Sequence, residues 1–187
     1  ACCEKEVFDL IISLGGNAVI TNSSLPSGTD RIFEAVTSIE GQESFDYIIN
    51  LQGDMPIINH LDIKKVITPL IQGFDIGTLV TNITLEEESN INITKAKIKW
   101  IKKNHIGEAL DFYKLSKKKI NNTYHHVGIY SFNFKSLKKF VELKPSLNEK
   151  YYKLEQWRAL DAKMSLGASF VENVPLSVDT KDDLIKV

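Results

Sequence analysis

Two aspartates far apart in the chain stand where each could bind a divalent cation. Asp54 comes shortly after the largely apolar run 47–51, which is typical of a strand buried on both faces of a sheet. Its carboxylate should therefore lie at a strand's carboxyl end, where ligands of open α/β sheets bind, and Gly53 would let a ligand approach the backbone. Asp179 also follows a short apolar strand. Together the two carboxylates could hold Mg2+, which favours a few carboxylates plus phosphate oxygens.

Ordinary structural roles compete with this interpretation. Gly53 and Asp54 could simply form a turn, and Asp179 could be the N-cap of a following helix. The segment 27–31, Ser-Gly-Thr-Asp-Arg, precedes apolar residues at helical spacing, so it too has the signature of an N-cap. A glycine-containing loop that opens a helix would also offer free N–H groups to an oxygen-rich ligand.

The chain's 23 basic residues include only two arginines, Arg31 and Arg158. A planar guanidinium can bind a carboxylate or phosphate with two parallel hydrogen bonds, which a lysine ammonium cannot. Each arginine therefore needs a reason, either a ligand contact or an internal ion pair. Arg158 is three residues beyond Glu155, a spacing at which the two can pair on one helix face.

Adjacent histidines occur in the expected strand 124–132. Because neighbouring strand residues face opposite sides, we expect His125 and His126 not to line the same pocket, so that at most one is functional. Tyr130 is four residues beyond His126 and on its face, so these two could contact one ligand. A hydrogen-bonded packing role is the alternative for a strand histidine.

Strand-like and helix-like segments alternate, which predicts an α/β fold with a mostly parallel, Rossmann-like sheet flanked by helices. The expected exception is an antiparallel hairpin over residues 95–113. A long helix is expected from residue 146 to Gly167, and the whole of 1–187 is expected to form one domain.

Composition limits the classes of function. A formal net charge of -1 provides no general field for nucleic acid. No apolar run reaches the ~18 residues of a membrane span, and the N-terminus lacks a signal-peptide pattern. The two cysteines, Cys2 and Cys3, are adjacent and resemble neither a disulfide framework nor a metal site, which favours a cytoplasmic protein.

Four sets of residues resemble the signature segments of one family in order and spacing: SGTDR at 27–31, LQGDMP at 51–56, HVGIY at 126–130 with LEQWR at 154–158, and VPLSVDTKDDL at 174–184. The chain is similar to the cytidylyltransferases that activate 3-deoxy-manno-octulosonate (KDO), the CMP-KDO synthetases. The resemblance implies that the KDO anomeric hydroxyl attacks the α-phosphate of CTP, giving CMP-KDO and pyrophosphate for lipopolysaccharide assembly. It also implies a homodimer.

The resemblance assigns roles by position. Asp54 and Asp179 are similar to the magnesium ligands. The residues similar to nucleotide contacts are Ser27, Gly28, Arg31, Gln52 and Gly53. Those similar to sugar contacts are His126, Tyr130, Glu155, Gln156 and Lys114.

Three departures from the family pattern leave alternatives open. The family's N-terminal strand and triphosphate-binding loop have no counterpart here, so we expect a segment that is deleted, cleaved or otherwise missing. Lys114 stands where the family has an arginine, and Met55 where it has an acid. The alternatives are a non-catalytic remnant that binds sugar or a partner, and a related enzyme such as an N-acylneuraminate cytidylyltransferase.

Overall fold

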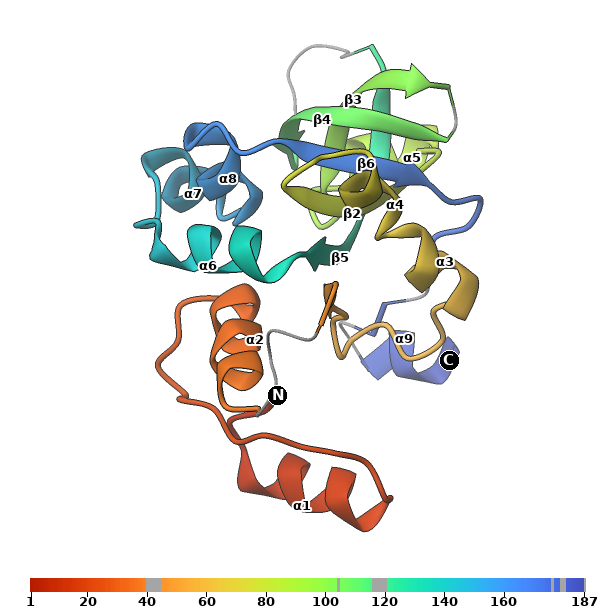
Figure 1. The fold of residues 1–187 in the computed structure, drawn as a ribbon. Helices are drawn as coiled ribbons and strands as arrows, with labels where there is room; N and C mark the ends of the chain where they lie inside the picture. Colours follow the sequence, from red (N-terminus) through yellow and green to blue (C-terminus); the bar gives the residue numbers. More distant parts are fainter. Residues whose placement is uncertain (40–44, 104, 116–120, 176, 179–180, 187) are drawn as a thin grey trace.

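The computed structural model describes residues 1–39, 45–103, 105–115, 121–175, 177–178 and 181–186. Its centre is a six-stranded sheet with the strand order β1-β5-β2-β6-β4-β3 (Figure 1). The strands are β1 (Ile48–Asn50), β2 (Ile76–Thr81), β3 (Lys95–Lys102), β4 (Ile106–Tyr113), β5 (Thr123–Phe132) and β6 (Leu166–Phe170). The helices are α1 (Lys5–Ser13), α2 (Gly28–Thr37), α3 (His60–Lys65), α4 (Thr68–Ile71), α5 (Leu85–Ser89), α6 (Phe134–Glu142), α7 (Leu147–Tyr152), α8 (Gln156–Asp161) and α9 (Lys181–Lys186).

The α/β class and the β3–β4 hairpin are confirmed, but the prediction of a mostly parallel sheet is wrong. Within the described residues only β2 and β6 pair in parallel, and every other pairing of named strands is antiparallel. The reason is that β5 runs between β1 and β2 in the opposite direction. An apolar run reports that a strand is buried on both faces, and an antiparallel strand in the middle of a covered sheet is buried in the same way.

Helices cover both faces of this sheet. One apolar cluster joins β2, β4 and β5 to α2, α6 and α8, and it includes Phe132, Leu137 and Ala159. A second cluster on the other face contains Val66, Leu79, Val127, Ile129 and Val171. Because β2 and β5 are buried along nearly their whole length, both faces of the sheet must be covered.

The expected long helix from residue 146 to Gly167 is also wrong. It is broken into α7 and α8 at Lys153, which has the left-handed φ of 55°. Leu154 is buried directly after this turn, so the burial of its apolar side chain offsets the helical hydrogen bonds that are lost at the break. Gly167 does not end a helix but lies within β6, where an added Cβ would come within 2.6 Å of the Phe74 ring.

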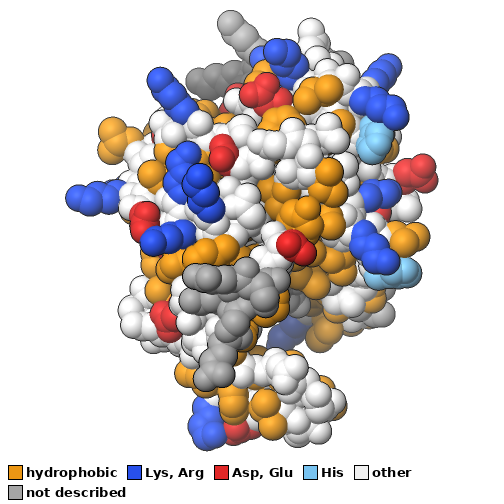
Figure 2. Space-filling view, in the orientation of Figure 1, with side chains coloured by type: hydrophobic (Ala, Val, Ile, Leu, Met, Phe, Trp, Pro, Cys, Tyr) orange, Lys and Arg blue, Asp and Glu red, His pale blue; other side chains and the backbone are white. Residues whose placement is uncertain are grey.

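Helix α1 stands apart from the sheet (Figure 1). None of its residues is buried, and its apolar side chains include Leu10, which is 56% exposed. Figure 2 shows hydrophobic side chains on this lower lobe of the molecule. None of the described helices is long and apolar enough to cross a bilayer.

Candidate active site

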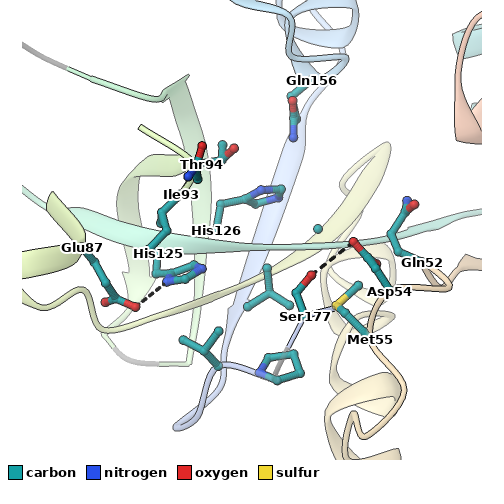
Figure 3. Close-up of a pocket in the computed structure, with 15 residues that line it drawn as sticks. Gln52, Asp54, Met55, Glu87, Ile93, Thr94, His125, His126, Gln156 and Ser177 are labelled. Carbon is teal, nitrogen blue, oxygen red and sulfur yellow. Dashed lines mark hydrogen bonds and ion pairs between the residues drawn. The ribbon is translucent and has the colours of Figure 1, made fainter. Parts of the chain in front are cut away.

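A pocket of about 520 Å³ opens beside the carboxyl end of β1, next to the middle of β5 (Figure 3). It is lined by Gln52, Asp54, Met55, Glu87, Asn92, Ile93, Thr94, His125, His126, Val127, Gly128, Gln156, Val174, Pro175 and Ser177. Four residues predicted to be functional are among them, namely Gln52, Asp54, His126 and Gln156. The fold therefore brings together groups more than 100 positions apart in the chain.

Asp54 lies on the exposed side of this pocket, where it meets the segment that follows β6. The Ser177 hydroxyl donates to Asp54 Oδ2 at 3.3 Å, and the Val178 amide donates to the Asp54 carbonyl at 2.8 Å. Asp179, the second predicted metal ligand, lies outside the described residues. Among the residues that are described, no group of three or more acidic, histidine or cysteine side chains is arranged to hold a metal ion.

His126 is 5% exposed and is held between the rings of Phe112 and Tyr130. Burial lowers the pKa of His126 from 6.5 to about 3, and the neighbouring His125 adds to this effect, so the ring is neutral at physiological pH. Its Nε2 lies 2.9 Å from the Thr78 hydroxyl, which donates its own proton to the Ile129 carbonyl at 2.8 Å. In the tautomer that fits this donation, Nε2 donates to Thr78 and Nδ1 is an acceptor.

Gln156 connects the pocket to a buried polar group behind it. Its Nε2 donates to the Tyr130 hydroxyl, while its buried Oε1 has no hydrogen-bond partner among the described residues. Tyr130 and Glu155 do not line the pocket. Burial raises the pKa of both side chains, and the two Glu155 oxygens accept from the Thr29 hydroxyl at 3.1 Å. The unpaired Oε1 leaves Gln156 ready to accept a hydrogen bond from a hydroxyl-bearing ligand.

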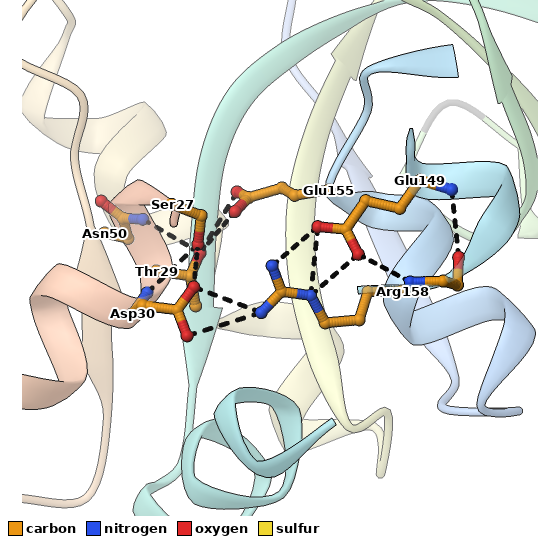
Figure 4. Close-up of polar contacts among 8 residues, drawn as sticks. Ser27, Thr29, Asp30, Asn50, Glu149, Glu155 and Arg158 are labelled. Carbon is orange, nitrogen blue, oxygen red and sulfur yellow. Dashed lines mark hydrogen bonds and ion pairs between the residues drawn. The ribbon is translucent and has the colours of Figure 1, made fainter. Parts of the chain in front are cut away.

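The segment 27–31 is tied to α8 by a buried ionic network (Figure 4). Ser27 caps α2 by accepting from the Asp30 amide, and it also donates to Asp30 Oδ2 at 2.6 Å. Arg158, 2% exposed, binds Asp30 through Nη1 at 3.2 Å and Glu149 through Nη2 at 2.7 Å. The N-cap role of the segment is thus present, whereas the Glu155–Arg158 pair considered from spacing does not form.

Four other residues with predicted contacts are outside the pocket wall. Arg31 braces the preceding loop by donating to the Thr21 hydroxyl at 2.7 Å. Gly28 faces the Gln52 amide, whose atoms would lie 3.8 Å from an added Cβ, and Gly53 forms an open turn. The Lys114 carbonyl accepts from Lys95 at 2.6 Å. Their predicted ligand roles stay predictions.

The expectation that only one of the paired histidines could line a pocket is wrong. Both His125 and His126 contribute to the lining, and Figure 3 shows them on either side of β5. Alternation holds, but the strand itself forms part of the wall at Val127 and Gly128, so the pocket meets both of its sides. Sequence reasoning also missed Glu87, whose Oε1 lies 3.0 Å from His125 Nδ1. Its position in the acidic segment 85–90 is typical of a surface turn of helix and carries no local signal of a pocket.

Comparison with known proteins identifies the family of this chain. The family model described as cytidylyltransferase matches residues 1–166. The 3-deoxy-manno-octulosonate cytidylyltransferase of Paramagnetospirillum magneticum is 42% identical, covering 98% of this chain and 76% of the relative. The enzyme of the same name from Rickettsia felis is 40% identical, covering 97% of this chain and 73% of the relative.

Solved structures give the same result. A structure of CMP:2-keto-3-deoxy-manno-octonic acid synthetase complexed with CTP superposes with a TM-score of 0.84 at 27% identity, covering 98% of this chain and 75% of that one. Apo UDP-glucose pyrophosphorylase superposes with a TM-score of 0.61 at 15% identity, which shows a shared fold alone. The chain belongs to the 3-deoxy-manno-octulosonate cytidylyltransferase family of nucleotidyltransferases.

Proposed function

We propose that this protein transfers CMP from CTP to KDO, giving CMP-KDO and pyrophosphate for lipopolysaccharide biosynthesis. The observation that carries the proposal is the convergence of Gln52, Asp54, His126 and Gln156 on one pocket, in a chain that is 42% identical to a curated KDO cytidylyltransferase. In this reaction the sugar's anomeric oxygen forms a bond to the α-phosphorus of CTP, the bond to pyrophosphate breaks, and the hydroxyl proton is lost to solvent.

The side chains of the pocket suit the positioning of a polyhydroxylated acid sugar. Neutral His126 presents Nδ1 as an acceptor, and Gln156 presents the unpaired Oε1, so both can accept from sugar hydroxyls. Burial keeps the two groups fixed, since His126 is bonded to Thr78 and Gln156 to Tyr130. Fixed partners hold the nucleophile near the phosphate and so lower the entropic part of the barrier.

Asp54 and Asp179 are the residues we propose to hold Mg2+. The Asp54 carboxylate is exposed to the pocket, and the segment bonded to it through Ser177 and Val178 directly precedes Asp179 in the sequence. An oxygen donor set of this kind fits magnesium, which would neutralise charge on the α-phosphate. Asp54 itself would orient the nucleotide at the end of β1.

We also propose a cytoplasmic homodimer, by analogy with the family. The β3–β4 hairpin and the helix containing Trp157 are the candidate contact regions. Analytical ultracentrifugation tests this state directly, and a monomer at micromolar concentration would contradict it.

The activity is tested by pyrophosphate release from CTP and KDO with magnesium. Asp54→Asn and Asp179→Asn should each lower kcat about 100-fold or more, because a carboxylate that neutralises developing charge is lost. The matched control is Asp62→Asn, which alters a partly exposed aspartate paired with Lys65 on α3 and should leave the rate unchanged.

Binding of CTP and of KDO is measured by calorimetry beside turnover, because the chain spans 73–76% of these two relatives' lengths. Use of N-acylneuraminate in place of KDO would contradict the sugar assignment. Binding of KDO without pyrophosphate release would favour a non-catalytic sugar-binding protein. Full activity in both Asp54→Asn and Asp179→Asn would refute the metal site.

A further inference from the structure

His125 and Glu87 form a hydrogen-bonded pair at the wall of the pocket, and the roles described so far leave this pair unused. Glu87 comes from α5, where its Oε2 accepts from the Thr84 amide at 2.9 Å as part of a capping box. Its other oxygen, Oε1, lies 3.0 Å from His125 Nδ1. One carboxylate thus both caps a helix and holds the imidazole, so the orientation of His125 is fixed by a rigid element.

This pairing determines which ring nitrogen of His125 is available to a ligand. Burial alone would raise the pKa of Glu87, but hydrogen bonds from Thr84 and His125 outweigh it and hold that pKa below its ordinary value. The carboxylate is therefore ionised and can only accept, so Nδ1 carries a proton and donates. Nε2 has no hydrogen-bond partner among the described residues. Figure 3 shows it on the side of the ring that faces Ser177 and Asp54 across the pocket.

The charged side chains that line the pocket indicate which residue could bind an anionic ligand. Its described lining residues include two acids, Asp54 and Glu87, but no lysine or arginine. His126 is neutral because of its burial. Among the described lining residues, His125 is the basic side chain whose second ring nitrogen is left for a ligand, while both substrates of the proposed reaction are anions.

We propose that His125, held by Glu87, binds an anionic oxygen of a substrate through a protonated Nε2, either the carboxylate of the acid sugar or a phosphate of CTP. The inference rests on the proposed function for the identity of the two anions. His125 contacts the substrate directly, and Glu87 is a positioning residue that acts through it. A substrate anion beside Nε2 together with Glu87 beside Nδ1 favours the doubly protonated ring.

The first test uses the unaltered protein. Imidazole ¹⁵N NMR compares the His125 Nε2 signal before and after the anion is added, and it should show a protonated Nε2 hydrogen-bonded to the anion in the bound protein. KDO and CTP are added in separate samples, so the sample that produces the change identifies the source of the anion. An Nε2 signal that neither substrate alters would overturn the proposal.

The second test separates substrate binding from structural support. His125→Gln should weaken binding of one of the two substrates about 10- to 100-fold, the range expected for one charge-assisted hydrogen bond, and should raise its KM with little change in kcat. Glu87→Gln keeps one acceptor oxygen, which can complete the capping box with Thr84, but places an NH2 donor beside Nδ1, so it should preserve the fold and weaken the same substrate by a smaller factor. The control is His105→Gln, on the turn between β3 and β4 and outside this pocket.

The outcomes distinguish this inference from the proposed function. If the unaltered protein binds KDO and CTP but His125→Gln and Glu87→Gln bind both as tightly, only the role of His125 fails. If the unaltered protein binds neither substrate, the proposed function fails and the role of His125 with it. If kcat falls while both KM values stay constant, the histidine is not a substrate-binding residue.

Discussion

The buried guanidinium of Arg158 provides the sharpest test of what holds the pocket together. It is 2% exposed, contacts the Phe140 ring at 4.7 Å, and binds two carboxylates from different helices, Asp30 on α2 and Glu149 on α7. Burial alone would lower the pKa of Arg158, but its bonds to Glu149 and Asp30 outweigh burial and raise it. Arg158→Met keeps the apolar stem and removes the charge, leaving both carboxylates in a poorly hydrated interior.

The expected cost follows from that geometry. Removing one partner of a buried ion pair destabilises a protein by about 3–5 kcal/mol, mainly because the other charge stays buried without compensation. For a domain of this size each kcal/mol lowers Tm by about 2–4 °C, so Arg158→Met should lower Tm by about 6–20 °C. That is a large part of the ~5–15 kcal/mol by which such domains are stable.

The chain's other arginine is a matched control. Arg31 donates to the Thr21 hydroxyl and, at 3.4 Å, to the Asn22 carbonyl, and no ion pair of Arg31 is present among the described residues. Arg31→Met should therefore cost only about 1 kcal/mol, the usual net value of a hydrogen bond. Scanning calorimetry and urea unfolding measure both variants, and the urea m-value shows whether the unfolding remains two-state.

A triple variant isolates the cause. Combining Arg158→Met with Asp30→Asn and Glu149→Gln removes the charges while keeping their shapes, and the amide introduced by Glu149→Gln can still complete the capping box with Ser146. Most of the lost stability should return. If Arg158→Met is as mild as Arg31→Met, or if the triple variant is no more stable than Arg158→Met alone, the cost does not come from unpaired buried carboxylates and the reasoning is refuted.

Three further predictions concern single positions. Gly128→Ala should leave Tm unchanged or slightly raised, because the added Cβ would meet no atom within 4 Å. Calorimetry should nevertheless show weaker substrate binding, because the added methyl group enters the pocket. Tighter binding would contradict this prediction. His126, with its pKa lowered from 6.5 to about 3, makes the folded state lose stability as pH falls from 6.5 towards 3 and contributes no loss above 6.5. Urea unfolding at several pH values measures this effect. Between pH 6.5 and 3 the free energy of unfolding of His126→Gln should fall less steeply than that of the unaltered protein, by up to about 1.4 kcal/mol per pH unit. Equal slopes for the two proteins would disprove the lowered pKa of His126. Lys153→Gly should raise the free energy of unfolding by about 0.5–1 kcal/mol, because glycine adopts the φ of 55° at the end of α7 without strain; a loss of stability would show that the lysine side chain contributes more than the strain costs.

Local sequence patterns account for part of the polar wall of the pocket, on the side of Asp54. The apolar run before Gln52 places that amide and Asp54 beyond a strand end, and the resemblance to the family's segments pointed to His126 and Gln156. The position of Gln52 and Asp54 could be predicted because local patterns of apolar and turn residues specify where a strand stops, whereas the ligand roles of all four residues stay predictions. The α/β class and the β3–β4 hairpin follow from the same kind of local information.

Tertiary packing accounts for the direction of β5, the break at Lys153 and the lining of one pocket by both His125 and His126. Strand direction depends on which neighbours a strand meets, and an apolar run is the same whether those neighbours are parallel or antiparallel. The partners of Arg158 are equally non-local, since Asp30 lies 128 positions away, whereas spacing had suggested Glu155. Long-range electrostatic pairing is decided by packing, because a buried charge takes whichever opposite charges the folded helices bring within reach.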